Sequence, residues 1–337
     1  MIRLNRYFFS LIILFIVVKT GHAQVQLSST ITKKTEIYAI KDQDTLRMDI
    51  LKDSKYGNAI QPCLMFVFGG GFAGGTRDNA NYTSYFNRMT DAGFTIISID
   101  YRLLLASDGS NGNSAGGVSG AGGASGNTVN TNKISYSAKS AAIAGLLPAI
   151  LNPTAQLTNY KNAINAAVDD LFTATLYILN KHTYLQIDTS MVILSGSSAG
   201  AITIHHAVWE ISNRARNSVT LPQTFSYKGA IGFAGAILAG SSGVSYGKLP
   251  CPTLFIHGNK DEVVPYGTNN YVVMKLVGSS SIVSVFKNKK FPYQFVTVDG
   301  GTHDVSTSSM TNEQDRILSF IQKYIIEKQP FQIDETI

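Results

Sequence analysis

The pentapeptide Gly196-Ser197-Ser198-Ala199-Gly200 follows the apolar run 191–194 and opens a stretch of helical character. A serine centred between two glycines at a strand-to-helix turn is typical of a nucleophile elbow. The glycines avoid side-chain clashes in the tight turn, and the start of the helix favours negative charge beneath the exposed hydroxyl. Only Ser198 is centred between the glycines, so it is favoured over Ser197. The alternative is a small-residue turn without chemistry, and residues elsewhere in the chain decide between the two.

Apolar runs and amphipathic stretches alternate on both sides of this elbow. The predicted strands are 36–41, 46–51, 63–68, 94–99, 191–194, 230–233, 253–257 and 294–298. The predicted helices are 81–92, 160–181, 199–211 and 312–327. The first two strands flank the turn 42–45 and form a hairpin, whereas the later ones are short apolar runs of the kind buried on both faces. The fold class is therefore α/β, with a mainly parallel eight-stranded sheet, an antiparallel N-terminal strand and helices on both faces.

A glycine triplet directly follows the third predicted strand, in the sequence Phe68-Gly69-Gly70-Gly71-Phe72. Consecutive glycines let backbone N–H groups turn toward a ligand. Two such donors, with the N–H of the residue after the nucleophile, form an oxyanion hole. Gly70, Gly71 and Ala199 are the candidate donors. A flexible turn without chemistry is the alternative.

An acidic residue follows the strand 253–257, in His257-Gly258-Asn259-Lys260-Asp261-Glu262-Val263-Val264-Pro265. Active sites of open α/β folds collect at the carboxyl ends of the strands, and a carboxylate there can orient an imidazole. Asp261 is favoured and Glu262 is the rival. A helix-capping aspartate or a surface ion pair would be the structural alternative.

The chain contains six histidines, and only His303 lies in a glycine-rich loop after both Ser198 and Asp261. The loop reads Gly300-Gly301-Thr302-His303-Asp304 and follows the last predicted strand. The order Ser, Asp, His is the one that α/β-hydrolases have. We therefore expect Ser198, Asp261 and His303 to form a catalytic triad.

The first residues have the layout of a secretory signal peptide. Arg3 and Arg6 precede the run 7–18, which is apolar except for Ser10, and small residues at 21–23 suit a cleavage site. A membrane anchor is the alternative, but a spanning helix needs roughly 20 apolar residues. We expect export to the periplasm or the medium, and a single mature domain over 24–337.

The charge of the chain gives little support for nucleic acid or an anionic membrane as a partner. The formal net charge is +6, and cleavage would remove three basic residues and no acidic ones, leaving about +3. That is too small for such partners. Cys63 and Cys251 belong to separated strands and are expected to stay unpaired; with no clustered His they indicate no metal site, and nothing indicates a cofactor.

One segment breaks the alternation of strands and helices. Residues 107–131 are almost all Gly, Ser, Asn, Ala and Thr. Such a composition buries too little apolar surface to offset its ordering entropy, which predicts a mobile loop. The apolar stretch 143–151 suggests a short helix near the active-site mouth.

Taken together, the motifs resemble the esterase/lipase branch of the α/β-hydrolase superfamily, the carboxylesterase-like and hormone-sensitive-lipase-like group. The resemblance covers about residues 46–324. It rests on 68–72, 99–103, 196–200, 257–265 and 301–303, together with 170–177 and 187–188 before the elbow.

The chain departs from that pattern in two places, and one of its connections is short. The family usually has His where Phe68 stands, and that side chain helps to brace the glycine loop. The insertion that follows 101–103 replaces a short Ala-Pro segment. The connection 233–253 is too short for a large lid, which implies an open, shallow site.

The resemblance implies a serine carboxylic-ester hydrolase that works through an acyl-enzyme, with Ser198 as nucleophile, His303 as general base and acid, and Asp261 as the orienting acid. By analogy, the acyl groups of small esters or polysaccharides are candidate substrates. A serine peptidase of the same fold is one alternative, and a catalytically silent binding protein is another. The oligomeric state stays open.

Overall fold

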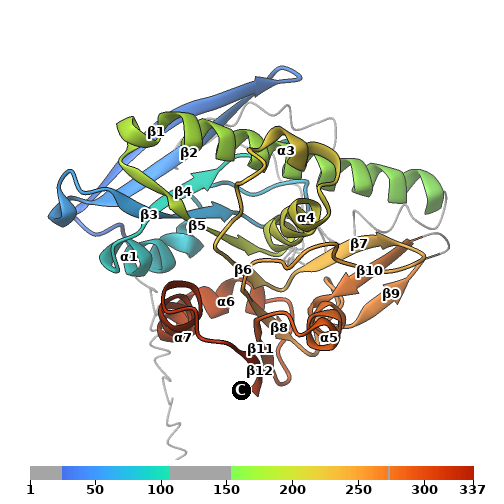
Figure 1. The fold of residues 1–337 in the computed structure, drawn as a ribbon. Helices are drawn as coiled ribbons and strands as arrows, with labels where there is room; N and C mark the ends of the chain where they lie inside the picture. Colours follow the sequence, from blue (N-terminus) through green and yellow to red (C-terminus); the bar gives the residue numbers. More distant parts are fainter. Residues whose placement is uncertain (1–24, 107–152, 272–273) are drawn as a thin grey trace, which may run out of the picture.

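The structure is a computed structural model that describes residues 25–106, 153–271 and 274–337 (Figure 1). The predicted signal peptide, the loop predicted over 107–131 and the helix predicted over 143–151 lie outside the described residues.

A large, mainly parallel sheet forms the centre of the molecule, as the alternation of strands and helices predicts. Its strand order is β1-β2-β4-β3-β5-β6-β8-β11-β12. β2 is antiparallel to β1 and β4, and every later pairing is parallel. The strands are β1 (Ile31–Lys41), β2 (Asp44–Asp53), β3 (Gln61–Val67), β4 (Thr95–Ile99), β5 (Ile187–Ser197), β6 (Gly229–Phe233), β8 (Thr253–Gly258), β11 (Tyr293–Val298) and β12 (Gln332–Thr336).

Helices cover both faces of this sheet, with α3 and α4 on one side and α1, α6 and α7 on the other (Figure 1). α5 lies on the α4 side, because Phe255 of β8 stacks on His205 of α4 and also contacts Phe286 of α5. The helices are α1 (Thr83–Asp91), α3 (Pro153–Leu185), α4 (Ala199–Asn213), α5 (Ser279–Lys289), α6 (Val305–Asn312) and α7 (Gln314–Phe320). In the described part of the chain, no helix is both long and apolar enough to cross a bilayer.

The structure corrects the prediction in three places. The main sheet has nine strands rather than eight, because β12 adds to β11 at the edge. The helix predicted over 312–327 is divided: α7 ends at Phe320 and the chain continues as a π-helical segment, Ile321–Ile326. The connection 233–253 contains a strand, β7 (Ala236–Gly240).

β7 belongs to a second sheet of the order β7-β10-β9, in which β10 (Met274–Gly278) is antiparallel to both neighbours. β9 (Thr268–Asn270) follows the loop after β8. This small sheet therefore extends the fold beyond the carboxyl ends of β6 and β8 (Figure 1).

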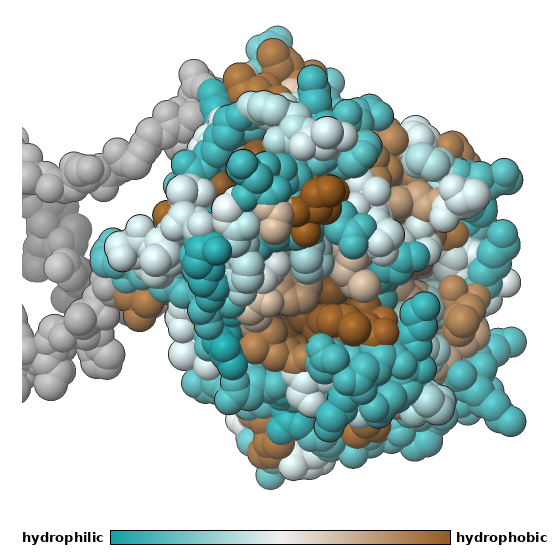
Figure 2. Space-filling model, turned by 60° about the vertical axis from the view of Figure 1, so that its left-hand side comes forward, coloured by the Kyte–Doolittle hydropathy of each residue, from teal (hydrophilic) through white to brown (hydrophobic). Residues whose placement is uncertain are grey.

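The central strands are almost entirely inaccessible to solvent, and β3, β4, β6 and β8 have no exposed position. Figure 2 shows one face of the molecule, where hydrophilic residues predominate and hydrophobic residues gather in a hollow. Strands buried on both faces fix the sheet firmly, so the loops at its carboxyl ends have a rigid base.

Candidate active site

The predicted elbow occurs where β5 ends at Ser197 and α4 begins at Ala199. Ser198 has a φ of 52°, in the left-handed region that a serine rarely adopts. Its N–H donates to the carbonyl of Phe233, 2.9 Å away, which holds the turn against β6. Strained backbone of this kind is common at functional residues.

Both glycines of the pentapeptide are needed for close approach. A Cβ at Gly200 would lie 1.9 Å from the carbonyl oxygen of Val67, and one at Gly196 would lie 2.5 Å from that of Gly200. The start of α4 is therefore in contact with the end of β3. The same approach brings the glycine loop that follows β3 next to the nucleophile.

His303 lies in the loop between β11 and α6, and its Nε2 is 2.8 Å from the hydroxyl oxygen of Ser198. Its Nδ1 is 2.8 Å from Oδ2 of Asp261. A carboxylate only accepts hydrogen bonds, so Nδ1 carries the proton and Nε2 is free to accept the proton of the Ser198 hydroxyl. The structure thus brings together the three residues that the sequence selects for the triad.

Asp261 lies in the turn that follows β8, and its carboxylate accepts hydrogen bonds from several donors. Oδ1 accepts hydrogen bonds from the N–H groups of Val263 and Val264, at 2.8 and 3.0 Å. Oδ2 is contacted by His303 and, at 3.2 Å, by Nε2 of His257. Burial alone would raise the pKa of Asp261, but the hydrogen bonds from the two imidazoles hold this pKa well below its usual range.

The rival acid, Glu262, is exposed, whereas Asp261 is buried beside the imidazole of His303. The two histidines of α4, His205 and His206, are buried, and the imidazole that contacts the Ser198 hydroxyl is that of His303. Burial lowers the pKa of both His205 and His206 to about 3, and Nε2 of His206 accepts a hydrogen bond from the N–H of Leu238.

The glycine loop packs directly on the elbow. A Cβ at Gly69 would lie 2.9 Å from the carbonyl oxygen of Ser197 and 3.1 Å from Cβ of Ser198. Gly70 and Gly71 have φ values of 138° and 65°, which turn the backbone sharply beside the nucleophile. Ala199 is the first residue of α4, where N–H groups have no partner within the helix. Ala199 therefore follows the nucleophile directly, and Gly70 and Gly71 follow Gly69, which packs against the elbow.

Phe68 braces the glycine loop by packing rather than through a polar side chain. Its ring stacks on Tyr101 with centroids 4.5 Å apart, and the Tyr101 hydroxyl donates to the carbonyl oxygen of Phe68 at 3.1 Å. A Cβ at Gly75 would lie 2.7 Å from the Phe68 ring, so the returning loop closes over it.

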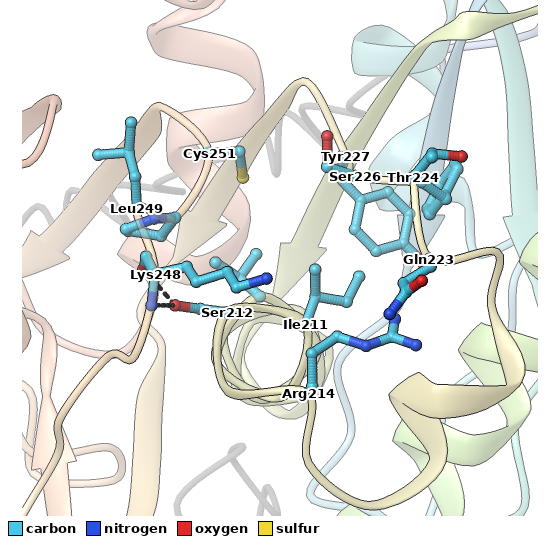
Figure 3. Close-up of a pocket in the computed structure, with 13 residues that line it drawn as sticks. Ile211, Ser212, Arg214, Gln223, Thr224, Ser226, Tyr227, Lys248, Leu249 and Cys251 are labelled. Carbon is cyan, nitrogen blue, oxygen red and sulfur yellow. Dashed lines mark hydrogen bonds between the residues drawn. The ribbon is translucent and has the colours of Figure 1, made fainter.

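A cavity of about 200 Å³ lies at the other end of the sheet (Figure 3). It is lined by the C-terminal part of α4 and by the segments that precede β6 and β8, including Arg214, Tyr227, Lys248 and Cys251. Strand β5 and helix α4 run in opposite directions, so this cavity faces the amino ends of the strands. The triad is not part of it.

Sequence reasoning missed two contributors to the site. The sequence pattern identifies His257 only as the end of a strand, and Ser279, at the start of α5, belongs to no motif. In the structure, Nδ1 of His257 lies 2.8 Å from the Ser279 hydroxyl oxygen. The sequence signal for His257 was its position four residues before Asp261, but its role depends on burial, which the sequence does not give.

The fold and the Ser198–His303–Asp261 arrangement define the class: this is a serine hydrolase with the α/β-hydrolase fold. Residues 165–314 match the family model described as Serine hydrolase (FSH1). That range contains the triad but does not include Gly70 and Gly71. A search of curated proteins finds no significant match.

Solved structures with the same fold include esterase 2 of the planctomycete Thermogutta terrifontis. Its apo form is 16% identical in sequence and has a TM-score of 0.56. The alignment covers 89% of the protein described here and 96% of the esterase. The propionate-bound form is 16% identical, with 86% and 94% covered and a TM-score of 0.54. The form phosphonylated by sarin is 15% identical, with 86% and 95% covered and a TM-score of 0.54. At this identity the likeness supports the fold, and the hormone-sensitive-lipase-like branch stays a prediction.

Proposed function

We propose that this protein is a serine carboxylic-ester hydrolase that acts through an acyl-enzyme. The observation that carries the proposal is the continuous chain of two 2.8 Å hydrogen bonds from Ser198 through His303 to Asp261. The solved neighbours add support, because the Thermogutta enzyme is described as an esterase and was obtained with propionate and with butyrate bound.

In the proposed reaction, Oγ of Ser198 attacks the ester carbonyl carbon while its proton passes to Nε2 of His303. The tetrahedral intermediate collapses, the alcohol leaves with that proton, and the acyl group stays on Ser198. Water then attacks the acyl carbon and gives a proton to Nε2. When this second intermediate collapses, the carboxylic acid is released and Ser198 recovers its proton from His303.

Two features lower the barriers to these steps. Asp261 keeps the proton of His303 on Nδ1 and stabilises the imidazolium that forms when Nε2 takes up a proton. The N–H groups of Gly70, Gly71 and Ala199 are proposed to stabilise the oxyanion of each tetrahedral intermediate. One such donor is worth about 10²- to 10³-fold in turnover in comparable enzymes.

The finer substrate class, acyl groups carried by polysaccharides, is part of the proposal. Its support is the signal-peptide layout of the first residues and the short connection between β6 and β8, residues 234–252, which includes β7. Turnover of p-nitrophenyl acetate, butyrate and decanoate and of methyl ferulate would rank the acyl groups. Hydrolysis of an aminoacyl anilide in preference to these esters would favour the peptidase alternative.

The first prediction tests the nucleophile. Ser198→Ala is expected to lower turnover of p-nitrophenyl acetate by about a million-fold and to abolish labelling by a fluorophosphonate probe. Folding should be retained, because α4 and β5 keep their packing.

Ser197→Ala is the matched control, since the Ser197 hydroxyl donates to the carbonyl oxygen of Ser306 at 2.8 Å, whereas Nε2 of His303 contacts the Ser198 hydroxyl. This variant should keep measurable turnover and probe labelling. Unchanged turnover in a purified, folded Ser198→Ala protein would remove Ser198 from the mechanism. Wild-type protein that neither hydrolyses esters nor reacts with the probe would favour the silent binding protein.

A further inference from the structure

We propose that His257 is a positioning residue of the active site, which holds the Asp261 carboxylate for His303 by donating a hydrogen bond to the same oxygen atom. The inference rests on the proposed function, because it assigns a role within the same triad. The observation behind it is that Oδ2 of Asp261 lies 2.8 Å from Nδ1 of His303 and 3.2 Å from Nε2 of His257.

The proton on the His257 ring can be placed from its partners. Nε2 faces Oδ2 of Asp261 at 3.2 Å and the carbonyl oxygen of Val264 at 3.1 Å. Both atoms only accept hydrogen bonds, so Nε2 must carry a proton. His257 is completely buried, and the side chain of Asp261 is too. Water therefore cannot replace this donor easily, and a buried carboxylate without it would be costly.

The opposite ring nitrogen is held by a group that can either donate or accept. Nδ1 of His257 lies 2.8 Å from the hydroxyl oxygen of Ser279, which is itself 3.1 Å from the carbonyl oxygen of Gly235. The hydroxyl can donate to Nδ1, or it can accept from Nδ1 while donating to Gly235. In both arrangements Nε2 keeps its proton, so an N–H donor stays 3.2 Å from Oδ2 of Asp261 and 3.1 Å from the carbonyl oxygen of Val264, and we propose that it serves both.

The titratable groups that surround His257 come from every element packed on it. They are Asp261 in the loop after β8, His303 after β11, His205 on α4 and Tyr266, whose ring centroid lies 5.7 Å from that of His257. Among the groups just named from the described residues, Asp261 supplies the carboxylate oxygen that lies 3.2 Å from Nε2 of His257. It is therefore the group whose charge His257 stabilises, and the hydrogen bond fixes where the negative charge lies relative to His303.

A purely structural role and a positioning role predict different results for amide substitutions. In His257→Gln, the longer side chain places an N–H donor near the position of Nε2, within reach of Asp261. In His257→Asn, the shorter side chain places its amide near Nδ1, where it meets Ser279 instead. His257→Leu fills the space without any donor.

The decisive measurement is kcat and KM for p-nitrophenyl acetate in all three variants. We expect His257→Leu and His257→Asn to lower kcat by about 10- to 100-fold with KM changed less than about threefold, and His257→Gln to recover most of the loss. His206→Gln is the control. His206 is buried, like His257, but it lies on α4 and accepts a hydrogen bond from the N–H of Leu238, so the kcat of this variant should stay near that of wild type.

Several outcomes would overturn the inference. A folded His257→Leu protein with the kcat of wild type would do so, and so would equal activity of the Gln and Asn variants. If His257→Leu does not fold, the comparison of Gln with Asn still decides. If wild-type protein hydrolyses no ester, the proposed function fails.

A measurement without substrate distinguishes failure of the inference about His257 from failure of the proposed ester hydrolysis. The low pKa of Asp261 contributes stability above the pKa of the unfolded aspartate, near 4, and that contribution is lost as the pH falls. Neither His257→Gln nor His257→Leu can titrate at position 257, so their difference reports the donor to Asp261. As the pH falls from about 5 to about 2, the unfolding free energy of His257→Gln should fall more steeply, because the carboxylate of that variant stays ionised to lower pH in the folded state. Equal slopes would contradict the inference even in an inactive protein.

Discussion

Tyr101 donates its buried hydroxyl proton to the carbonyl oxygen of Phe68, at the residue where the glycine loop leaves β3. A buried carbonyl that loses its donor costs about 1–3 kcal/mol. We predict that Tyr101→Phe lowers the unfolding free energy by that amount. It should also lower kcat for p-nitrophenyl acetate by about tenfold, because the loop that carries Gly70 and Gly71 becomes less fixed.

Urea denaturation and steady-state kinetics would measure the two effects of Tyr101→Phe. Tyr227→Phe is the matched control, since its buried hydroxyl lies 2.6 Å from the Thr175 hydroxyl oxygen, and Tyr227 lines the cavity at the other end of the sheet. The control should lose stability and keep kcat. Equal kcat in both variants would show that the hydroxyl of Tyr101 does not support the loop.

The chemistry of single residues was predictable where a backbone constraint leaves a mark in the sequence. The glycines around Ser198 and the chain order of Ser198, Asp261 and His303 were sufficient to select three side chains that meet in the structure. The part played by His257 was not predictable in this way. It depends on two hydrogen bonds of one buried ring, and a histidine at the end of an apolar strand has no sequence pattern that distinguishes this arrangement.

At the scale of elements, helix α4 carries a buried carboxyl near its C-terminal end. Burial raises the pKa of Glu210 to about 7 from a usual value of 4.5, against the opposing effect of Arg216, whose Nε lies 2.9 Å away. The folded state therefore binds a proton more tightly than the unfolded state between these values. The contribution of Glu210 to stability is therefore greatest below about pH 4.5 and falls as the pH rises toward 7.

We predict that Glu210→Gln removes this fall, which the pKa difference puts at about 3 kcal/mol. Unfolding free energies measured in urea at about pH 5 and pH 8 would show it. The variant should be more stable than wild type at pH 8 and close to it at pH 5. A variant that is less stable than wild type at pH 8 would show that the ionised pair with Arg216 outweighs the cost of burial.

The elements that sequence reasoning missed share weak patterns. α5 begins with three serines, which favour helix ends over helix interiors, although Ile282, Val283 and Phe286 form a buried face. The strand β12, Gln332–Thr336, lies at the sheet edge and has no buried position. β9 and β10 are short and partly exposed. Each of these elements is stabilised by the neighbour it pairs with, and a local pattern does not identify that neighbour.

At the scale of the whole molecule, strand order determines which cysteines can meet. Cys63 lies on β3 and Cys251 precedes β8, with β5 and β6 between those strands, and both thiols are free, as predicted. Neighbouring strands are about 4.8 Å apart, whereas the Cα atoms of a disulfide lie within about 7 Å. Burial also raises the pKa of both thiols, so they are poor nucleophiles.

Thiol titration of the unfolded, unreduced protein is therefore expected to find two free thiols per chain. Titration of the folded protein should be much slower, because Cys63 is inaccessible. Non-reducing electrophoresis would detect any bond between chains. Finding no free thiol and no such bond would contradict the strand order.

The parallel arrangement of the central strands also governs how the active site is assembled. Ser198 is separated from His303 by 105 residues, and His303 from Asp261 by 42. Contacts so distant in sequence form only after the intervening crossovers have closed, and this closure is the slow part of folding for such topologies. The rate at which turnover recovers after dilution from denaturant therefore reports the rate at which β3 through β11 align. Partly folded chains, in which the triad is not assembled, contribute no turnover.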